Sequence, residues 1–174
     1  MITTTAIPES YIGSFERLEK QQRPAWLQSL RQQGFSRFNE TGFPTTHDED
    51  WRFTNVAPIS RTEFETAPRP HISVADLDAF RTSDFACQLT FVNGRFAPGL
   101  SRIPEIGRVK IGSLAQALAS DPGNLQKHLG NYLNFKRDAF SALNTAFIQD
   151  GAYIHISRGT VDIGTILKIG RAHV

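Results

Sequence analysis

Cysteine is almost absent from this chain. Cys87 is the single cysteine among 174 residues. One thiol allows neither an internal disulfide nor a metal site built from several cysteines. Long apolar runs are also missing, since none approaches the roughly 20 residues that a membrane-spanning helix needs. Residues 1–5, MITTT, lack the basic start and apolar centre of a signal peptide. We therefore expect a cytoplasmic protein with no membrane partner.

An excess of charge of one sign is lacking too. Nineteen Lys and Arg residues face seventeen Asp and Glu residues, which gives a net charge of +2. A small nucleic-acid-binding domain needs a basic face, so this class gains little support and we predict no nucleic-acid partner. Hydrophobic residues make up 40% of the chain. That fraction is enough for the core of one domain, or of one domain and part of another.

The first 42 residues are predicted to form a helical hairpin, because their apolar residues recur at helical spacing. Pro8 and Pro24 suit helix starts, and Gly42 followed by Pro44 suits a helix end. Gly34 is a weak point within the second helix.

The next segment is predicted to begin a third helix. Thr46 and Glu49 have the spacing of a capping box, and Asp48, Glu49 and Asp50 would occupy the first turn. Trp51 and Phe53 would then supply its apolar side chains. Residues 57–72 hold three prolines and are predicted to be an extended connector.

The second half of the chain mixes strand and helix signals. Asn93-Gly94 lies between two strand-like runs and predicts a hairpin with a type I′ turn. We expect another strand at 108–111, a helix capped by Ser113 that ends before the break at 121–123, and helices at 125–129 and 138–148. Residues 152–157 alternate strictly, with Ile154 and Ile156 on one side. We predict that this strand has no partner left in the chain.

These patterns predict an α+β fold: an N-terminal helical domain leading into a β-rich domain that is cut off after its start. The predicted divisions are a helical region with its connector at 1–85, a hairpin and helices at 86–149, and the start of the β-rich core at 150–167.

Three groups of residues are candidates for chemistry. His47 to Asp50 resemble a metal or acid–base cluster, but neighbouring helical residues point in different directions, so a helix start explains them better. His155 shares a strand face with Tyr153 and Ser157, for which a half-exposed polar face is the commoner cause. Cys87 is more simply a buried small residue than a reactive thiol. No phosphate-binding glycine loop, nucleophile elbow or zinc-binding helix motif occurs. We predict no catalytic residue and no metal ligand.

Three stretches together resemble one family. FPTTHDEDWRFTNV (residues 43–56) is similar to the P-T-x-x-x-E-x-W-[RK]-[YF]-T signature of the SufB/SufD family of iron–sulfur cluster assembly proteins. FVNGRF (91–96) resembles the Asn-Gly hairpin of its SufD members. LNTAFIQDGAYIHISRG (143–159) is similar to the segment that enters the family's β-helix, although Ser157 stands where proline is usual.

The resemblance implies a non-catalytic, SufD-like scaffold subunit of a SufB–SufC–SufD complex. Its fold would be an N-terminal helical domain that leads into the first rungs of a right-handed parallel β-helix, here truncated. The partners would be SufB-like subunits and SufC-like ATPase subunits, and the complex, not this fragment, would handle the iron–sulfur cluster. Glu49, Trp51, Arg52 and Thr54 fall on signature positions and would lock the N-terminal domain.

Two further expectations concern the end of the chain and an alternative function. Residues 168–174, KIGRAHV, depart from the family and match one reading frame of a common sequencing adapter, so we predict a non-native tail. The alternative function is a carbohydrate-active β-helix enzyme, which requires paired carboxylates on a groove. The strand that begins the predicted β-helix offers His155 and Asp162 but no such pair.

Overall fold

The computed structural model describes residues 7–64, 67, 72–80, 85, 87–105, 107–160, 164 and 166–171. The chain divides into two units that interleave in sequence. Residues 1–66 and 123–148 form the first unit, and residues 67–122 and 149–174 form the second. The predicted α+β class is confirmed. The predicted domain divisions at 85, 149 and 167 stay predictions.

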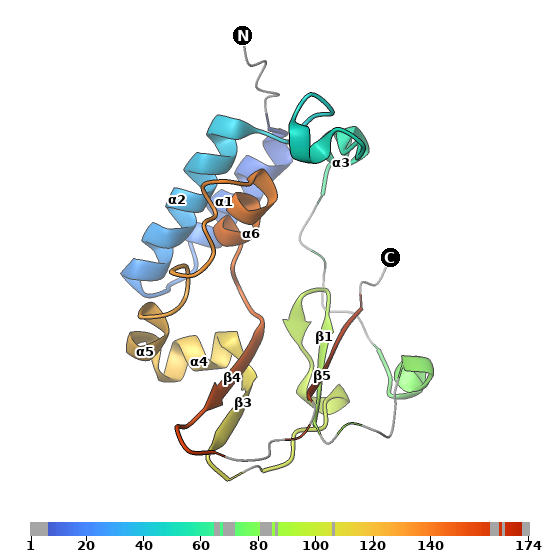
Figure 1. The fold of residues 1–174 in the computed structure, drawn as a ribbon, viewed down its shortest axis with the longest axis vertical. Helices are drawn as coiled ribbons and strands as arrows, with labels where there is room; N and C mark the ends of the chain where they lie inside the picture. The colour runs from blue at the N-terminus through green and yellow to red at the C-terminus, as the bar shows by residue number, and fades with distance from the viewer. Residues whose placement is uncertain are drawn as a thin grey trace. The chain divides into compact units, whose positions relative to one another are not determined.

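The first unit is helical (Figure 1), and its hairpin is confirmed. Helix α1 spans Glu9–Glu19 and α2 spans Ala25–Thr41. Pro8 and Pro24 stand one residue before their helices, as the N-caps. Gly42 ends α2 with a φ of 64°, a conformation that glycine adopts without strain. Helix α6 (Ala139–Ala146) packs against α2, and Asp138 caps it by accepting from Ser141 N.

Two predictions for residues 46–72 are wrong. No capping box forms at Thr46, because the carboxylate of Asp48 accepts from both the backbone N and the hydroxyl of Thr45 and so closes a turn. A single 3-10 turn follows at Glu49–Trp51. The supposed connector contains helix α3 (Ala57–Arg61), which has a proline in its first turn, where the missing N–H costs nothing.

Aromatic side chains fill the core of the first unit. Phe38 is fully buried and Phe43 nearly so, and their rings meet edge to face with centroids 5.0 Å apart. Tyr11 contacts Phe43 in the same manner at 5.6 Å. Edge-to-face pairs add to the burial of apolar area, so these rings fix how α1, α2 and the chain after α2 pack together.

The buried side chain of Arg31 also links α2 to the backbone just after α6. The Arg31 side chain is fully buried, and its Nε donates to the carbonyl of Ile148 at 2.9 Å, while Nη2 donates to the same oxygen. Nη1 lies 3.9 Å from the carboxylate of Glu19. Burial lowers the pKa of Arg31, Glu19 opposes that shift, and Arg23 adds to it.

Arg31→Ala is expected to cost the first unit about 3–5 kcal/mol, because it removes one partner of a buried charge pair. Arg31→Lys should recover only part of this loss, since an ammonium cannot reproduce the two converging bonds from Nε and Nη2 to Ile148 O. Arg61→Ala, at an exposed position of the same unit, is the control and should stay within about 0.5 kcal/mol. Urea unfolding measures all three. A loss below about 1 kcal/mol for Arg31→Ala contradicts the structural role.

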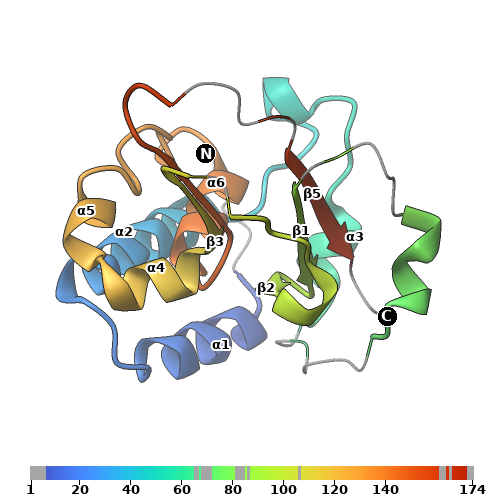
Figure 2. The same cartoon turned by 90° about the horizontal axis from the view of Figure 1, so that it is seen from below.

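The second unit holds two small sheets. Strand β1 (Cys87–Val92) is central, with β2 (Arg95–Phe96) antiparallel on one side and β5 (Ile166–Arg171) parallel on the other (Figure 2). Asn93 and Gly94 have φ values of 48° and 74°, so the predicted hairpin turn is confirmed. Strand β3 (Val109–Ser113) pairs antiparallel with β4 (Ala152–Ile156).

The helices between these strands follow the predicted order. Ser113 caps α4 (Leu114–Ser120) by accepting from Gln116 N, as predicted. Helix α4 ends there, and α5 (Pro122–Gln126) starts at the proline, earlier than the predicted helix at 125–129; from Gly123 on, this helix belongs to the first unit. A short 3-10 helix at Ala75–Phe80 and another at Pro98–Leu100 complete the described elements of the second unit.

The prediction that the strand at 152–157 lacks a partner is wrong, because β4 pairs with β3 along its length. Ile154 and Ile156 share one side of β4, as predicted, and this apolar side is exposed, at 42% and 47%. In the predicted tail, Lys168 to Arg171 continue β5 beside β1. The foreign origin of residues 168–174 stays a prediction. Stacked β-helix rungs do not appear among the described residues, whose strands form only these two sheets.

Candidate interaction sites

Residues 43–56, hereafter the signature segment, form one wall of a polar pocket in the first unit. The pocket encloses about 380 Å³. The end of α2 and the start of α6 supply the other walls. Its lining residues are Arg37, Thr41, Gly42, Pro44, Asp48, Glu49, Asp50, Trp51, Arg137, Asp138 and Ala139. Four carboxylates and two guanidinium groups thus meet around one hollow.

Two of the four carboxylates already have structural partners. Asp48 holds the turn with Thr45. Asp138 accepts from Ser141 N at 2.7 Å at the start of α6. Burial alone would raise the pKa of Asp138, but hydrogen bonds from Ser141 and Phe140 outweigh it and lower the pKa below the usual value. Only Glu49 and Asp50, both exposed, remain in the pocket to meet a ligand.

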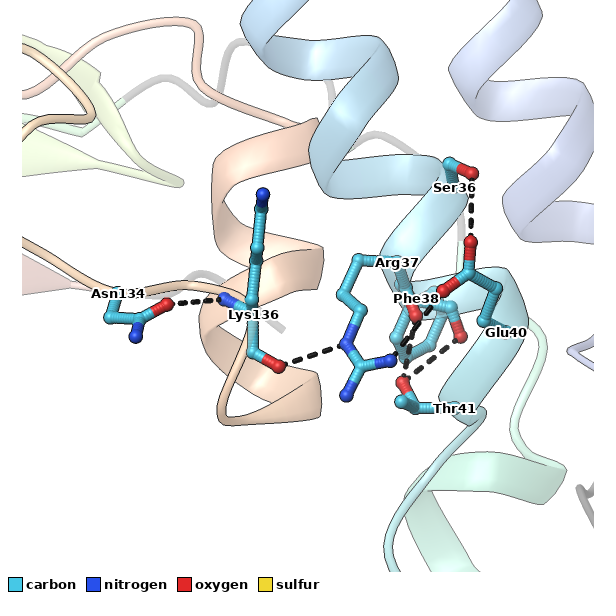
Figure 3. Close-up of polar contacts among 7 residues, drawn as sticks. All are labelled: Ser36, Arg37, Phe38, Glu40, Thr41, Asn134 and Lys136. Atoms are coloured by element: carbon cyan, nitrogen blue, oxygen red, sulfur yellow. Dashed lines mark hydrogen bonds and ion pairs between the residues drawn. The ribbon is translucent and has the colours of Figure 1, made fainter.

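Arg37 borders the same pocket and joins α2 to the chain before α6 (Figure 3). Its Nε donates to the carbonyl of Lys136 at 2.8 Å, and its Nη1 lies 3.5 Å from the carboxylate of Glu40. The Thr41 hydroxyl donates back to the carbonyl of Arg37 at 2.9 Å. Arg37 therefore acts first as a clamp on the backbone of this loop.

Trp51 and Phe53 of the signature segment have different surroundings. Trp51 is half-buried, with its ring centroid 5.0 Å from that of Phe140 on α6. Phe53 is 94% exposed, and the guanidinium of Arg52 lies 5.6 Å from its ring centroid. The prediction that Phe53 joins the core is wrong. In a signature that reads Trp-Arg-Phe-Thr, only the tryptophan packs inward.

A second pocket of the first unit is apolar. It encloses about 430 Å³ between α1, α6 and the chain after α3. Its lining residues are Tyr11, Ser14, Phe64, Phe140, Leu143, Asn144 and Phe147. Burial raises the pKa of the Tyr11 phenol, so its hydroxyl stays neutral at physiological pH. Such a hollow suits an apolar side chain and offers no acid–base pair.

The sequence candidates in the second unit do not form a reactive centre. Tyr153 and His155 share a face of β4, as predicted, and their rings lie nearly parallel with centroids 6.4 Å apart. Ser157 follows β4 and is half-buried. No hydrogen bond links the three side chains, so they form no proton relay. Asp162 lies outside the described residues.

Cys87 is a buried small residue, as predicted. It is fully buried at the start of β1. Burial raises the pKa of its thiol, and the partial opposition comes from Arg102, which is distant in sequence. A protonated, inaccessible thiol is a poor nucleophile. Among the described residues no group of three or more His, Cys, Asp or Glu side chains could hold a metal ion.

Sequence reasoning missed the most connected side chain of the second unit. The Asp150 carboxylate accepts from the backbone N of Phe96 at 2.8 Å, Ala115 at 3.0 Å and Gly151 at 2.8 Å. It also accepts from the Ser113 hydroxyl at 2.7 Å. Burial alone would raise the pKa of Asp150, but these four hydrogen bonds hold it below the usual value. The available signal was an aspartate followed by a glycine at the junction of the predicted helix and the alternating strand.

Comparison with known proteins places the chain in a family. The model of the SufBD protein N-terminal region matches residues 6–169. The chain therefore belongs to the SufBD family and corresponds to its N-terminal region, which confirms the resemblance of the three motifs. A curated relative, the iron–sulfur cluster assembly SufBD family protein slr0076 of Synechocystis sp., is 30% identical over 121 residues. The aligned part covers 67% of this chain but only 26% of the relative.

None of the described helices is long and apolar enough to cross a membrane.

Proposed function

We propose that this chain is the N-terminal part of a SufD-like scaffold subunit in an iron–sulfur cluster assembly complex of the SufB–SufC–SufD type. The family match over residues 6–169 carries the proposal. The hairpin at Asn93-Gly94, with both residues at positive φ, favours the SufD-like subtype. In the cytoplasm the subunit would bind SufB-like and SufC-like partners. The cluster would be the cargo of the complex.

The character of the two pockets supports a binding role without catalysis. One is apolar, and in the other two of four carboxylates are committed to a turn and a helix cap. A general acid–base pair needs free groups with suitably tuned pKa values. Neither Asp138 nor Asp150 is free for such a role, because Asp138 caps α6 and the carboxylate of Asp150 accepts four structural hydrogen bonds.

The remainder of the subunit would carry the right-handed parallel β-helix, with strand β4 near its entry. The chain spans about a quarter of its curated relative, so there is ample length for it. Any residues that bind iron or a cluster would lie there. The alternative of a carbohydrate-active enzyme requires paired carboxylates on a solenoid groove. Neither the family match nor either pocket favours it.

Co-purification tests the proposal. The intact gene, with an affinity tag, is co-expressed with SufB-like and SufC-like subunits of the same organism. We expect all three proteins to elute together from size-exclusion chromatography at a constant ratio. The same partners expressed without the tagged protein are the control for retention on the resin. An intact, folded protein that elutes alone contradicts the proposal.

A further inference from the structure

We propose that the loop of residues 127–137, between α5 and α6, is a docking surface for an acidic segment of a partner protein that also carries an apolar side chain. The loop presents two large side chains to solvent: Tyr132 is 79% exposed and Leu133 is 53% exposed. Tyrosine is among the residue types that are enriched in the hot spots of protein interfaces, and Leu133 adds apolar area beside it.

The phenol ring of Tyr132 is held in one orientation. It lies against the His128 imidazole with ring centroids 5.9 Å apart and an interplanar angle of 24°. The hydroxyl of Tyr132 and Nδ1 of His128 are 2.7 Å apart, within hydrogen-bond distance. The second face of the ring remains available for a partner. An oriented tyrosine gives contact area at a low entropic cost.

Basic residues flank this apolar centre in the sequence. Residues 122–137 contain no Asp or Glu, but they contain Lys127, Lys136 and Arg137. Arg137 also lines the polar pocket beside the carboxylates of that pocket. The exposed Lys127 and Lys136 therefore form the cationic rim. A rim of this sign attracts acidic partners and disfavours basic ones.

The inner side of the loop is fixed to the core of the first unit. Leu125 and Phe135 are both 7% exposed and anchor its two ends. Gly130 has a φ of 82°, and a Cβ there would lie 2.7 Å from a methyl carbon of Leu30 on α2. The loop thus approaches α2 as closely as a glycine allows.

Hydrogen bonds complete the support. The side-chain amide of Asn131 donates to the carbonyl of Lys127 at 2.9 Å. Lys136 N donates to the side chain of Asn134 at 3.2 Å, and the clamp from Arg37 holds the carbonyl of Lys136 (Figure 3). A surface that is ordered before binding loses less entropy when a partner docks. The loop therefore combines an exposed hot spot, a charged rim and a preorganised backbone.

An acidic protein segment fits this surface better than a nucleic acid does. Binding to a phosphate backbone normally uses many cationic contacts, whereas this loop offers two free lysines in a chain of net charge +2. Tyr132 is the single exposed Phe, Tyr or Trp of residues 127–137, so this loop offers one stacking platform for a base. Leu133, beside it, calls for an apolar partner group instead of a base.

Selection from a library of short random peptides tests the proposal. The library is selected on the 174-residue chain and counter-selected on a Tyr132→Ala, Lys136→Glu double variant. We expect enriched peptides that combine Asp or Glu with Leu, Phe or Trp. Synthetic versions should lose at least about tenfold in affinity for Tyr132→Ala. Their binding should also weaken as salt screens the lysines.

Phe53→Ala is the matched control, because Phe53 is as exposed as Tyr132 and lies in the same unit but follows Asp48, Glu49 and Asp50. It should leave peptide affinity unchanged, and tryptophan fluorescence should show that every variant is folded. The proposal is overturned if no peptide distinguishes wild type from the double variant, or if those that do are not acidic. A single-stranded RNA that binds more tightly and with equal dependence on Tyr132 overturns it as well. These outcomes are independent of whether the three-subunit complex forms.

Discussion

Gly34→Ala is expected to destabilise the first unit by about 2–3 kcal/mol, because it overpacks a tight helix contact. A Cβ at Gly34 would lie 2.8 Å from the backbone N of Ala146 and 2.9 Å from the carbonyl of Ala142. Both contacts are with backbone atoms of α6, which cannot move aside as a side chain can. Alanine is the better helix former by about 1 kcal/mol, so helix propensity alone predicts the opposite sign.

Gly13→Ala is the matched control for this variant. Gly13 lies within α1, and a Cβ there would make an ordinary contact with the Arg17 guanidinium at 3.5 Å. This substitution should stabilise the unit by about 0.5–1 kcal/mol through helix propensity. Trp26 and Trp51 both lie in the first unit, so tryptophan fluorescence during urea unfolding reports on it. Equal effects of the two substitutions would contradict the close contact of α2 and α6.

Asp150→Ala is expected to cost the second unit about 3–4 kcal/mol, because the buried Ser113 hydroxyl and three half-buried N–H groups lose a charged acceptor. The single carboxylate joins the hairpin at Phe96, the start of α4 and the start of β4. The stability of the Asp150→Asn variant should lie between that of the Asp150→Ala variant and that of the wild type. Its one oxygen can replace Oδ1, which accepts three of the four bonds, but its amide would face the N–H of Phe96.

Hydrogen exchange of the β3 and β4 amides measures this effect, since both tryptophans report on the other unit. Glu105→Ala, at an exposed position of the second unit, should change protection by less than about 0.5 kcal/mol.

The pKa of Asp150 is lower in the folded protein than its ordinary 3.8. The stabilisation by the Asp150 carboxylate is therefore fully present above the ordinary pKa of 3.8, and it is lost as the pH falls through the lower pKa of the folded protein. The Asn variant should lack this acid-dependent loss. Protection that is equal in the Ala variant and wild type would contradict the role of Asp150.

Local signals predicted the fold well where one residue type decides the backbone. Pro24 and Gly42 delimit α2, Ser113 caps α4, and Asn93-Gly94 make the hairpin turn. The capping-box prediction at Thr46 failed because two local hydrogen-bonding patterns compete there. The carboxylate of Asp48 reaches the preceding Thr45 and closes a turn before a helix can start.

Contacts between distant parts of the chain could not be predicted in this way. The partner of β4 is β3, about 40 positions earlier in the sequence, and an alternating pattern does not say which strand lies opposite. The same holds for Arg31, whose partner is the carbonyl of Ile148. Both pockets are formed by segments from the two ends of the first unit, so no single motif indicated them.

Gly34 shows how a local interpretation can miss a tertiary role. By helix propensity it is a weak point in α2, whereas in the fold it lets α2 and α6 approach. The exposed Phe53 shows the converse. Its place in an aromatic motif predicts an apolar side chain packed inside the fold, but the side chain of Phe53 lies in solvent.

We propose that this chain, which belongs to the N-terminal region of the SufBD family, is part of a longer scaffold subunit. Sequencing the intact genomic locus across codon 167 tests it most directly. We predict that the reading frame departs from KIGRAHV after residue 167 and continues through several hundred residues of short alternating strands. A stop codon directly after Val174 in the genome would contradict the claim, because the chain would then lack the region in which the scaffold role is proposed to lie.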